Sequence, residues 1–548
     1  MMEIRLLSSL EKVFLDEAPQ EIPLRLTAMQ GETTAFQLAF RDTETAWQEV
    51  TLQVESAAQV HIRQVAHVPV RMANYPDGDR DTLRGGVPGL YPDLLVEVRP
   101  HALKLSPCWT TLWVDVSAEE SGIHPVTLRL TGESGLLAER TIPVEVLPAA
   151  LPPQKLLLTR WFHCDGLAQY YGVDVFSEEH WALIERFLRS AAGHGVNMVL
   201  TPIHTPPLDT AVGHERLTTQ LVDVAVEDGE YRFGMDKLRR WIRLAKDCGI
   251  THFEMAHLYT QWGAHHAPKI MAAVNGEVRR IFGWDTPAVC DEYRAFLAAY
   301  IPAVRRVLAE EGVAENTRWH ISDEPSGRNM AAYLAARRQT DDLLDGCIVM
   351  DALSKFDFYQ QGVVAHPVVA TDHVQPFIDA NMPDLWVYYC CAQYKKTANM
   401  FIAMPSCRSR ILGFQLFRYR AAGFLHWAWN FYNCMYSYYP VDPYQTTDAD
   451  CGVPAGDPFQ VYPGEGGEPV ESLRLMVFDH ALNDLRACEL LAEKKGRVYA
   501  EALLDEAFGG KLTFETQADA MALLALRERI NREIMALEKV STHDGYQL

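Results

Sequence analysis

The spacing of hydrophobic residues along the chain changes character once, near residue 150. Before that point, short apolar or alternating runs recur between turn-forming stretches, which predicts an all-β unit arranged as a β-sandwich. The runs occupy residues 23–29, 33–42, 49–56, 60–70, 110–117, 125–132 and 140–148. A Pro-rich segment at 147–155 follows, and its composition is typical of a joint between domains.

After this joint, apolar runs of strand length alternate with longer amphipathic segments. This rhythm predicts parallel strands joined by helices, and eight such units make a TIM (β/α)8 barrel. A doubly wound open sheet is the structural alternative, because the fifth and sixth units offer only short helices. The eight strands are expected at 156–165, 196–203, 251–258, 318–325, 347–353, 363–370, 385–391 and 423–429.

The expected helices carry the usual signals of helix ends. The segment 177–195 opens with Ser177 followed by two acidic residues, which suits an N-cap and a first turn. Gly195 and Gly249 stand where helix C-caps belong. Further helices are expected at 235–249, 292–312, 329–345, 398–420, 472–496 and 522–540.

These patterns divide the chain into three predicted domains. A β-sandwich occupies residues 1–150, and the α/β barrel occupies 151–496, with the helix at 472–496 as its last helix. Residues 497–548 form a C-terminal helical extension, and its amphipathic segment is expected to pack on the barrel.

Composition and charge narrow the possible partners and location. A hydrophobic fraction of 48% allows a large core, and a net charge of -22 argues against binding to nucleic acid or to an anionic membrane. The beginning of the sequence lacks the pattern of an export signal, and no stretch is apolar for the length of a membrane span. The 11 cysteines include no CxxC pair and are expected to be reduced and mostly buried. A cytoplasmic location is therefore predicted.

Two adjacent acids, Asp323 and Glu324, follow the fourth predicted strand and precede Pro325. Neighbouring residues of a strand point to opposite faces, so the two acids share a pocket only if the strand ends between them, as Pro325 favours. Two close carboxylates do not both ionise easily, and the acid with the raised pKa can donate a proton near neutral pH. A solvated acidic pair is the alternative interpretation.

Aromatic residues are concentrated after the eighth strand, where nine lie between Phe424 and Tyr444. Aromatic faces stack on the C–H faces of sugar rings, so this density points to a carbohydrate pocket. Trp427, Trp429 and Tyr432 are the candidates to line it, although one of the two tryptophans is expected to fill the barrel.

Other chemically capable residues stand at the ends of the remaining strands. The candidates for substrate binding are Arg160, His163, Asp165, His257, Tyr259, Trp262, Asp351 and Tyr388, and Asp372 joins Asp351 as a possible second acid. A metal site can be imagined from Glu254, His257, His265 and His266, but HExxH-like spacing is lacking, and no metal is expected. The sequence contains no GxGxxG, Walker or GxSxG motif, and no cofactor is expected.

Together these features resemble glycoside hydrolase family 123, whose catalytic domain was formerly called domain of unknown function 4091. The similarity covers most of the chain and rests on four motifs. They are YPD (91–93), HISDEPS (320–326), GFLHWAWN (423–430) and YPG…SLRL (462–475). The segment HALNDLRACELL (480–491) departs from the family, because it lacks the EDYEYL-like run associated with it there.

The resemblance implies a retaining exo-β-N-acetylgalactosaminidase-type reaction in which the 2-acetamido group of the substrate is the nucleophile. Glu324 would be the general acid and then the base, and Asp323 would orient the acetamide and stabilise its positive charge. An ionised Asp323 is also expected to raise the pKa of Glu324.

Two alternatives stay open at this point. In the first, Asp351 or Asp372 is a conventional nucleophile acting on a sugar without an acetamido group. In the second, the barrel is not catalytic and only binds glycans through its aromatic residues.

Overall fold

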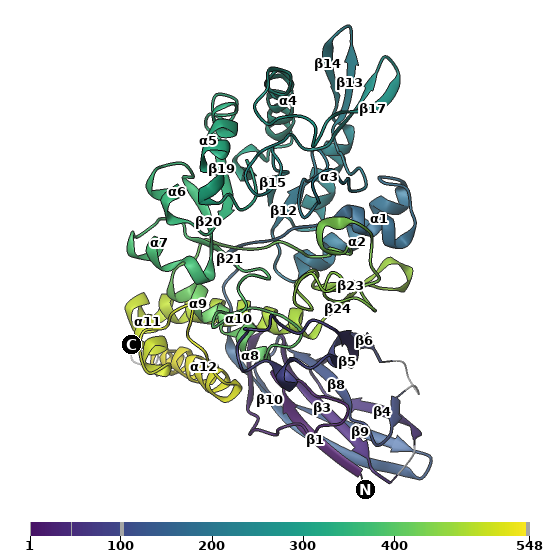
Figure 1. Cartoon of the computed structure of the whole chain (residues 1–548). Helices are drawn as coiled ribbons and strands as arrows, with labels where there is room; N and C mark the ends of the chain where they lie inside the picture. The colour runs from purple at the N-terminus through teal and green to yellow at the C-terminus, as the bar shows by residue number, and fades with distance from the viewer. Residues whose placement is uncertain (1, 45–46, 99–102, 544–548) are drawn as a thin grey trace.

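A computed structural model describes residues 2–44, 47–98 and 103–543 of the chain (Figure 1). Two β-sheets occupy the N-terminal part, a closed barrel of eight parallel strands follows, and helices complete the C-terminal part. The predicted fold class is therefore confirmed, and the alternative of an open doubly wound sheet is wrong.

The N-terminal part consists of two five-stranded sheets that share one hydrophobic core. One sheet has the order β1 (Met2–Ser8), β3 (Thr34–Asp42), β8 (Thr110–Ser117), β5 (Gln59–Val70) and β6 (Gly89–Glu97). The other has the order β2 (Leu26–Gln30), β10 (Gly135–Ala150), β9 (Gly122–Gly132), β4 (Gln48–Glu55) and β7 (Leu103–Leu105). Alternate residues such as Phe36, Leu112 and Leu128 point into the space between them.

All seven predicted strands of this part exist, but β1, β6 and β7 were not predicted. Turn-forming residues hide β6, because Gly89, Pro92 and Asp93 interrupt its apolar pattern. Strand β7 has only three residues, which is too short for a visible periodicity.

The barrel strands follow one another in chain order, and the last strand pairs with the first. They are β11 (Leu157–Arg160), β12 (Met198–Thr201), β15 (His252–Met255), β18 (Thr317–Trp319), β19 (Ile348–Leu353), β20 (His366–Ala370), β21 (Trp386–Tyr388) and β22 (Gly423–His426). Seven of them lie within predicted ranges, and β18 begins one residue before its range, at Thr317. Every neighbouring pair is parallel. The end of the first predicted strand is corrected, because Cys164 begins helix α1 (Cys164–Tyr171).

The outer helices agree with the sequence pattern in most units. They are α2 (Glu178–Gly193), α3 (Asp236–Asp247), α4 (Asp291–Glu310), α5 (Met330–Arg338), α6 (Phe356–Gln360), α7 (Gln375–Asp379), α8 (Ser406–Arg410), α9 (Leu412–Arg418) and α10 (Leu473–Lys495). The hydroxyl of Ser177 caps α2 by accepting a hydrogen bond from the His180 amide. Two predicted ranges are too long, because α5 ends at Arg338 and the helix expected from 398 begins only after Pro405.

A small four-stranded sheet was not predicted. It has the order β14 (Glu230–Gly234), β13 (Asp223–Glu227), β16 (Ile270–Val274) and β17 (Glu277–Phe282), and its strands come from the loops after β12 and β15. The sheet lies at the end of the molecule opposite the sandwich (Figure 1). Its hairpins turn at Asp228-Gly229 and Asn275-Gly276, which are strong hairpin signals.

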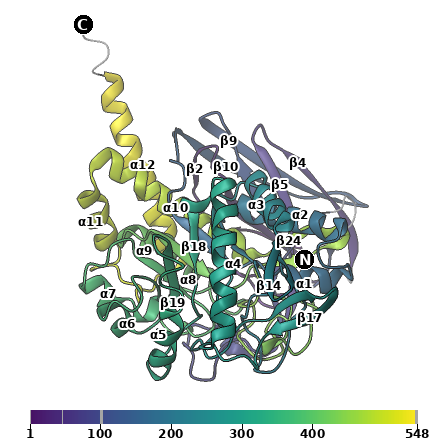
Figure 2. The ribbon, with the colours of Figure 1, turned by 90° about the horizontal axis from the view of Figure 1, so that it is seen from above.

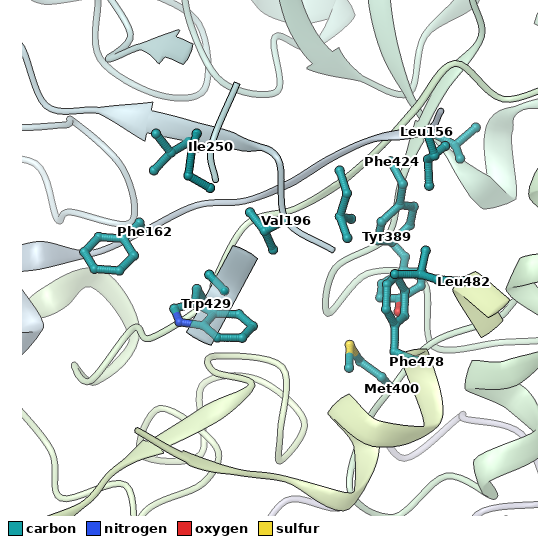
Figure 3. Packing of buried hydrophobic residues seen from close by; sticks show 14 of the residues in the cluster. Leu156, Phe162, Val196, Ile250, Tyr389, Met400, Phe424, Trp429, Phe478 and Leu482 are labelled. Carbon is teal, nitrogen blue, oxygen red and sulfur yellow. The ribbon is translucent and has the colours of Figure 1, made fainter. Parts of the chain in front are cut away.

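Helix α10 lies between the barrel and the sandwich and carries much of their shared core. Figure 3 shows Phe478 and Leu482 of α10 beside Phe424 of β22. One turn before Phe478, Arg474 donates hydrogen bonds of 2.8 and 3.0 Å to Asp93 of the sandwich, and both side chains are buried. A buried ion pair of this kind fixes the orientation of the two parts.

The C-terminal extension contains α11 (Arg497–Ala507) and α12 (Ala520–His543), and residues 544–548 of the predicted extension lie outside the described residues. Helix α12 packs on α10 and then runs away from the rest of the molecule (Figure 2). Arg527 of this helix pairs with Glu32 at 2.7 Å and with Asp484 at 3.0 Å. The extension therefore contacts the sandwich as well as α10, which the sequence did not indicate.

The structure bears on two predictions, the absence of a membrane span and the state of the cysteines. Within the described residues, every helix is too short or too polar to cross a membrane. All 11 cysteines are free, as predicted, but only Cys164, Cys248, Cys434 and Cys488 are buried, so the expectation of mostly buried thiols is wrong. A cytoplasmic location stays a prediction.

Candidate active site

Asp323 and Glu324 lie just beyond the carboxyl end of β18, in the loop that follows the fourth barrel strand. The strand ends at Trp319, so its end does not fall between the two acids as predicted. Glu324 instead has a left-handed backbone with φ of 44°, a conformation that non-glycine residues seldom adopt. This turn lets two adjacent side chains serve one pocket, and such local strain is often found at functional sites.

Both carboxyl groups are shifted toward the protonated form. Burial and the neighbouring Glu324 charge raise the pKa of Asp323 well above its usual range, while the His320 charge opposes this rise. Burial also raises the pKa of Glu324, and the charges of Asp372 and Asp457 add to this effect. The expected direction for Glu324 is confirmed, but the main cause is burial rather than the Asp323 charge.

Tyr388, at the end of β21, holds the Glu324 side chain. Its hydroxyl donates a hydrogen bond of 2.6 Å to Oε1 of Glu324, and this bond lowers the pKa of the acid against the effect of burial. Tyr388, a predicted binding residue, is therefore in direct contact with Glu324, the predicted general acid.

A buried ion-pair network lies beneath Asp323 inside the barrel, and its centre is His320. Nε2 of His320 is 2.9 Å from Oε2 of Glu254, and its Nδ1 is 3.4 Å from Oδ1 of Asp351. Burial opposes a charge here, but the two carboxylates overcome it and raise the pKa of His320 to about 9. His320 is therefore an imidazolium near neutral pH.

The two carboxylates of this network are themselves held by hydrogen bonds. Glu254 accepts from the hydroxyl of Thr159 and, at 3.1 Å, from the indole of Trp161. Asp351 accepts from the Tyr333 hydroxyl at 2.5 Å and from the backbone amide of Ile321 at 2.9 Å. Both oxygens of Asp351 are therefore engaged inside the barrel, and the prediction that Asp351 contacts substrate is corrected.

His257 also lies in this buried layer, where its ring stacks on His320 with a centroid distance of 4.4 Å and an angle of 23°. Ligand atoms of His257, His320 and Asp351 lie within 4.8 Å of one another. A metal ion must lie in the plane of each imidazole that binds it, and two nearly parallel stacked rings do not share such a point. The three residues are better suited to hold a proton on His320 than a metal ion. The predicted substrate contact of His257 is corrected, because its side chain is fully buried.

The metal-ligand set imagined from the sequence does not come together. Of its members, Glu254 and His257 belong to the buried layer, whereas His265 is exposed and the ring of His266 packs against Trp284 at 5.9 Å. The four residues are therefore divided between the barrel interior and an outer loop.

Trp262 and Trp427 are the predicted aromatic residues that reach the mouth of the barrel. The backbone amide of Trp262 donates a hydrogen bond of 2.8 Å to the carbonyl oxygen of Asp323, and its side chain is 40% exposed. Trp427 is half-buried beside the barrel interior, and its indole donates a hydrogen bond of 2.7 Å to Asp457. Both rings are therefore placed where a substrate could contact them.

Four other predicted contacts are corrected because their side chains point away from the barrel mouth. Thr159 faces the interior, so its neighbour Arg160 faces outward and lies 4.3 Å from the ring of Phe478. The other three, Tyr259, Trp429 and Tyr432, are at most 1% exposed and belong to the hydrophobic core. Figure 3 shows Trp429 within this packing.

His163 and Asp165 have a supporting role, because a buried arginine occupies their polar atoms. Arg216 binds both oxygens of Asp165 at 2.7 and 2.8 Å and donates to Nδ1 of His163 at 3.0 Å. Nε2 of His163 lies 3.0 Å from the carbonyl oxygen of Trp427. The predicted substrate contacts of His163 and Asp165 are therefore corrected, and the pair instead fixes the loop that carries Trp427.

Sequence reasoning missed the acids that surround the pair from other loops. Asp457 is buried near Trp427, and burial raises the pKa of Asp209 to about 6. Asp372, predicted as a reserve acid, accepts hydrogen bonds from Gln393 at 2.9 Å and from His373 at 2.7 Å. The sequence pattern does not single out Asp209 and Asp457, because neither stands directly at the end of a predicted barrel strand.

A closed barrel with a carboxyl pair at the carboxyl end of its fourth strand has the architecture of a barrel glycosidase. Residues 161–491 match the family model described as "Glycoside hydrolase 123, catalytic domain". The match covers more than half of the chain, so the chain belongs to glycoside hydrolase family 123, and the predicted resemblance and enzyme class are confirmed. A search of curated protein sequences finds no match.

A solved structure of the same family agrees with this fold. A family 123 glycoside hydrolase from Clostridium perfringens, described in a study of glycolipid glycan hydrolysis, aligns with a TM-score of 0.74 and 15% identity, over 99% of this chain and 100% of that chain. A family 39 glycoside hydrolase from Bacteroides cellulosilyticus WH2 aligns with a TM-score of 0.36 and 10% identity, over 80% of this chain and 81% of that chain.

Proposed function

We propose that this family 123 enzyme is a retaining exo-β-N-acetylhexosaminidase of the N-acetylgalactosamine type, with the 2-acetamido group of the substrate as nucleophile. The observation that carries the proposal is the adjacent pair Asp323 and Glu324, in which each acid has different partners. Tyr388 holds Glu324, whereas Asp323 lies next to the charged His320 network. Different partners allow the two acids different roles.

In the first step, the protonated Glu324 donates its proton to the glycosidic oxygen. The acetamide oxygen of the substrate attacks the anomeric carbon, the bond from that carbon to the glycosidic oxygen breaks, and the rest of the glycan leaves as an alcohol. The Asp323 carboxylate accepts a hydrogen bond from the acetamide N–H and stabilises the positive charge of the cyclic intermediate. That charge acts together with the His320 imidazolium to favour the ionised form of Asp323.

In the second step, Glu324 removes a proton from water, which attacks the anomeric carbon and opens the cyclic intermediate. The anomeric configuration is retained because the carbon is attacked twice from opposite sides. The raised pKa of Glu324 suits both steps, because the group must be protonated in the first and basic in the second.

The alternative of a conventional nucleophile receives less support. Asp351 is fully buried, and its oxygens are occupied by Tyr333, Ile321 and His320. Asp372 is bound by Gln393 and His373 at the edge of the site. We also propose that the substrate is the terminal β-linked sugar of a glycan, in line with the glycolipid glycans named for the Clostridium perfringens enzyme.

The direct test is hydrolysis of chromogenic β-N-acetylgalactosaminides and β-N-acetylglucosaminides. Glu324→Gln and Asp323→Asn should each lower kcat by about 100-fold to 10,000-fold, because each removes a proton-transfer or charge-stabilising group. A thiazoline mimic of the cyclic intermediate should inhibit strongly. Full activity in both variants would disprove the assignment of the acids, and weak thiazoline inhibition of an active enzyme would favour a conventional nucleophile.

A further inference from the structure

We propose that a row of aromatic side chains, Trp262, Tyr436, Tyr438 and His214, binds the sugar residues that follow the cleaved one in an extended glycan. We call this row the aromatic ridge. The proposal rests on the function proposed above, because it assigns the ridge to the leaving-group side of the same site. It goes beyond that function by predicting a preference for oligosaccharides over simple glycosides.

The ridge is continuous from one ring to the next. The centroids of Trp262 and Tyr436 lie 5.7 Å apart, and their planes meet at 87°. Tyr436 and Tyr438 follow at 6.4 Å and 84°, and Tyr438 contacts His214 at 4.5 Å and 81°. The rings come from three different loops, those after β15, β22 and β12, and edge-to-face contacts of this geometry are favourable.

The ridge begins at the catalytic pair and leads to the surface. The Trp262 amide is bonded to the carbonyl oxygen of Asp323, and the Trp262 side chain is already 40% exposed. Tyr438, farther along, is 52% exposed. A ligand that reaches Tyr438 from the catalytic pair must therefore extend past more than one aromatic ring of the ridge. Such a ligand must also be attached to the sugar held by Asp323.

Hydrogen bonds between the loops after β22 and β12 hold the middle of the ridge in position, although part of that backbone is strained. The backbone amide of Tyr436 donates a hydrogen bond of 3.0 Å to Asp209, and the carbonyl oxygen of Tyr436 accepts one of 3.0 Å from the Ala211 amide. The hydroxyl of Ser437 donates a third, of 2.6 Å, to the carbonyl oxygen of Asp209.

Trp262 and Tyr436 both have a left-handed backbone, with φ of 60° and 63°. Such backbone is costly for bulky residues and persists where the surroundings fix it. A rigid surface loses little conformational freedom when a ligand binds.

The chemistry of the ridge selects a sugar chain as its occupant. Aromatic faces stack on the apolar C–H faces of sugar rings, and indole and phenol edges supply polar atoms for hydroxyl groups. In an exo-acting enzyme the cleaved sugar lies in the pocket, so the remaining glycan must extend outward, where the ridge lies. The ridge is therefore continuous with the catalytic site, and the glycan that occupies it is the leaving group.

The experiment compares two substrates that reach different distances along the ridge. The first is the 4-nitrophenyl β-N-acetylgalactosaminide, whose leaving group is a single aryl ring. The second is a trisaccharide ending in β-linked N-acetylgalactosamine, whose two leaving sugars can reach Tyr438. Tyr438→Ser should lower kcat/KM for the trisaccharide about tenfold relative to kcat/KM for the nitrophenyl glycoside, because one stacking contact is lost.

Tyr439→Ser is the matched control, because Tyr439 is the next residue and is 49% exposed, but its hydroxyl bonds to Asp450 outside the ridge. The ratio of the two kcat/KM values should be the same in this variant as in the wild type. An unchanged ratio in Tyr438→Ser, with an active wild-type enzyme, would disprove the ridge and leave the proposed function intact. If the wild type hydrolyses neither substrate, the proposed function fails, and calorimetric titration of the same variants with the trisaccharide decides whether the ridge binds sugars.

Discussion

At the residue scale, Tyr388 adjusts the acidity of the proposed proton donor. Its hydroxyl bonds to Glu324 and stabilises the charged form of that acid. We expect Tyr388→Phe to raise the pKa of Glu324 further, because the hydrogen bond that stabilises the charged carboxylate is lost. The alkaline limb of the pH–activity profile should therefore move to higher pH.

The neighbouring Tyr389 supplies the control for this prediction. Its buried hydroxyl has no hydrogen-bond partner among the residues that the structure describes. Tyr389→Phe should leave the alkaline limb where it is in the wild type. If the limb stays in place in Tyr388→Phe as well, the hydrogen bond does not control the acidity of Glu324.

His320 sets the charge of Asp323 from beneath the site. The imidazolium lowers the pKa of Asp323, whose other charged neighbours, Glu324, Asp351 and Asp209, all raise it. In His320→Gln the positive charge is lost, so the pKa of Asp323 should rise and the acid limb of the kcat profile should move to higher pH. His257→Gln is the comparison, because burial keeps His257 neutral and its loss removes no charge. Identical acid limbs in the wild type and His320→Gln would contradict this role.

The pair of acids that we propose to be catalytic could be predicted from the sequence, but the residues that support it could not. Asp323 and Glu324 are adjacent and precede a proline, so one local pattern identifies both. Glu254 lies 66 positions before His320, and the two meet only when the third and fourth strands pair. The roles of the individual aromatic residues after β22 could not be predicted either, because periodicity does not show which ring faces the barrel mouth and which faces α10.

At the scale of elements, the close approach of α9 and α10 depends on a glycine. A Cβ at position 413 would lie 2.0 Å from the carbonyl oxygen of Ala481, which belongs to the backbone of α10. We expect Gly413→Ala to lower the free energy of unfolding by about 1–3 kcal/mol, because the two helices must move apart. Chemical denaturation followed by circular dichroism measures this change.

Gly193 in α2 is the matched control for this substitution. A Cβ there meets no described atom within 4 Å, so Gly193→Ala should be neutral or stabilise the protein by up to about 1 kcal/mol through helix propensity. Equal stability of the two variants would show that the α9–α10 contact adjusts without cost.

The elements themselves were predictable where hydrophobic periodicity was long. All eight barrel strands overlap predicted ranges, because each is a buried apolar run between helical segments. The hairpins at 223–234 and 270–282 were not predicted, although Asp-Gly and Asn-Gly turns mark them, because the strand–helix rhythm of the barrel predicts loops at these positions. Local turn chemistry would have recovered them.

At the scale of the whole molecule, we propose that the segments 1–150, 151–496 and 497–548 are three domains joined into one unit by buried charges. His194, directly after α2, is 2.6 Å from Asp479 of α10 and 3.5 Å from Glu471. Glu471 in turn pairs with Arg63 of the sandwich. The barrel and the sandwich are therefore connected through one chain of alternating charges.

This connection predicts how stability depends on pH. Burial opposes the charge of His194, but Asp479 and Glu471 raise its pKa from the ordinary 6.5 to about 10. The folded state therefore holds a proton that the unfolded state loses above pH 6.5, so this stabilisation is complete below that pH and is lost as the pH rises toward 10. His194→Gln should cost about 3 kcal/mol at pH 6 and much less at pH 10.

Thermal unfolding of the wild type and His194→Gln at both pH values measures this difference. Ser190→Ala, on the last turns of the same helix, is a comparison that leaves the ion pairs intact. A difference in stability that is the same at pH 6 and pH 10 would show that the proton on His194 does not contribute.

The pairing of the first barrel strand with the last has a consequence for biosynthesis. Leu157 pairs with Gly423 and Arg160 with His426, so the barrel cannot close until the roughly 260 residues between β11 and β22 have been translated. At about 5–20 residues per second, this takes on the order of 15–50 s after the first strand is made. All strands of the sandwich have been translated by then, whereas the first barrel strand still lacks the last strand, with which it pairs. A nascent chain of this enzyme should therefore depend on chaperones chiefly during translation of the barrel.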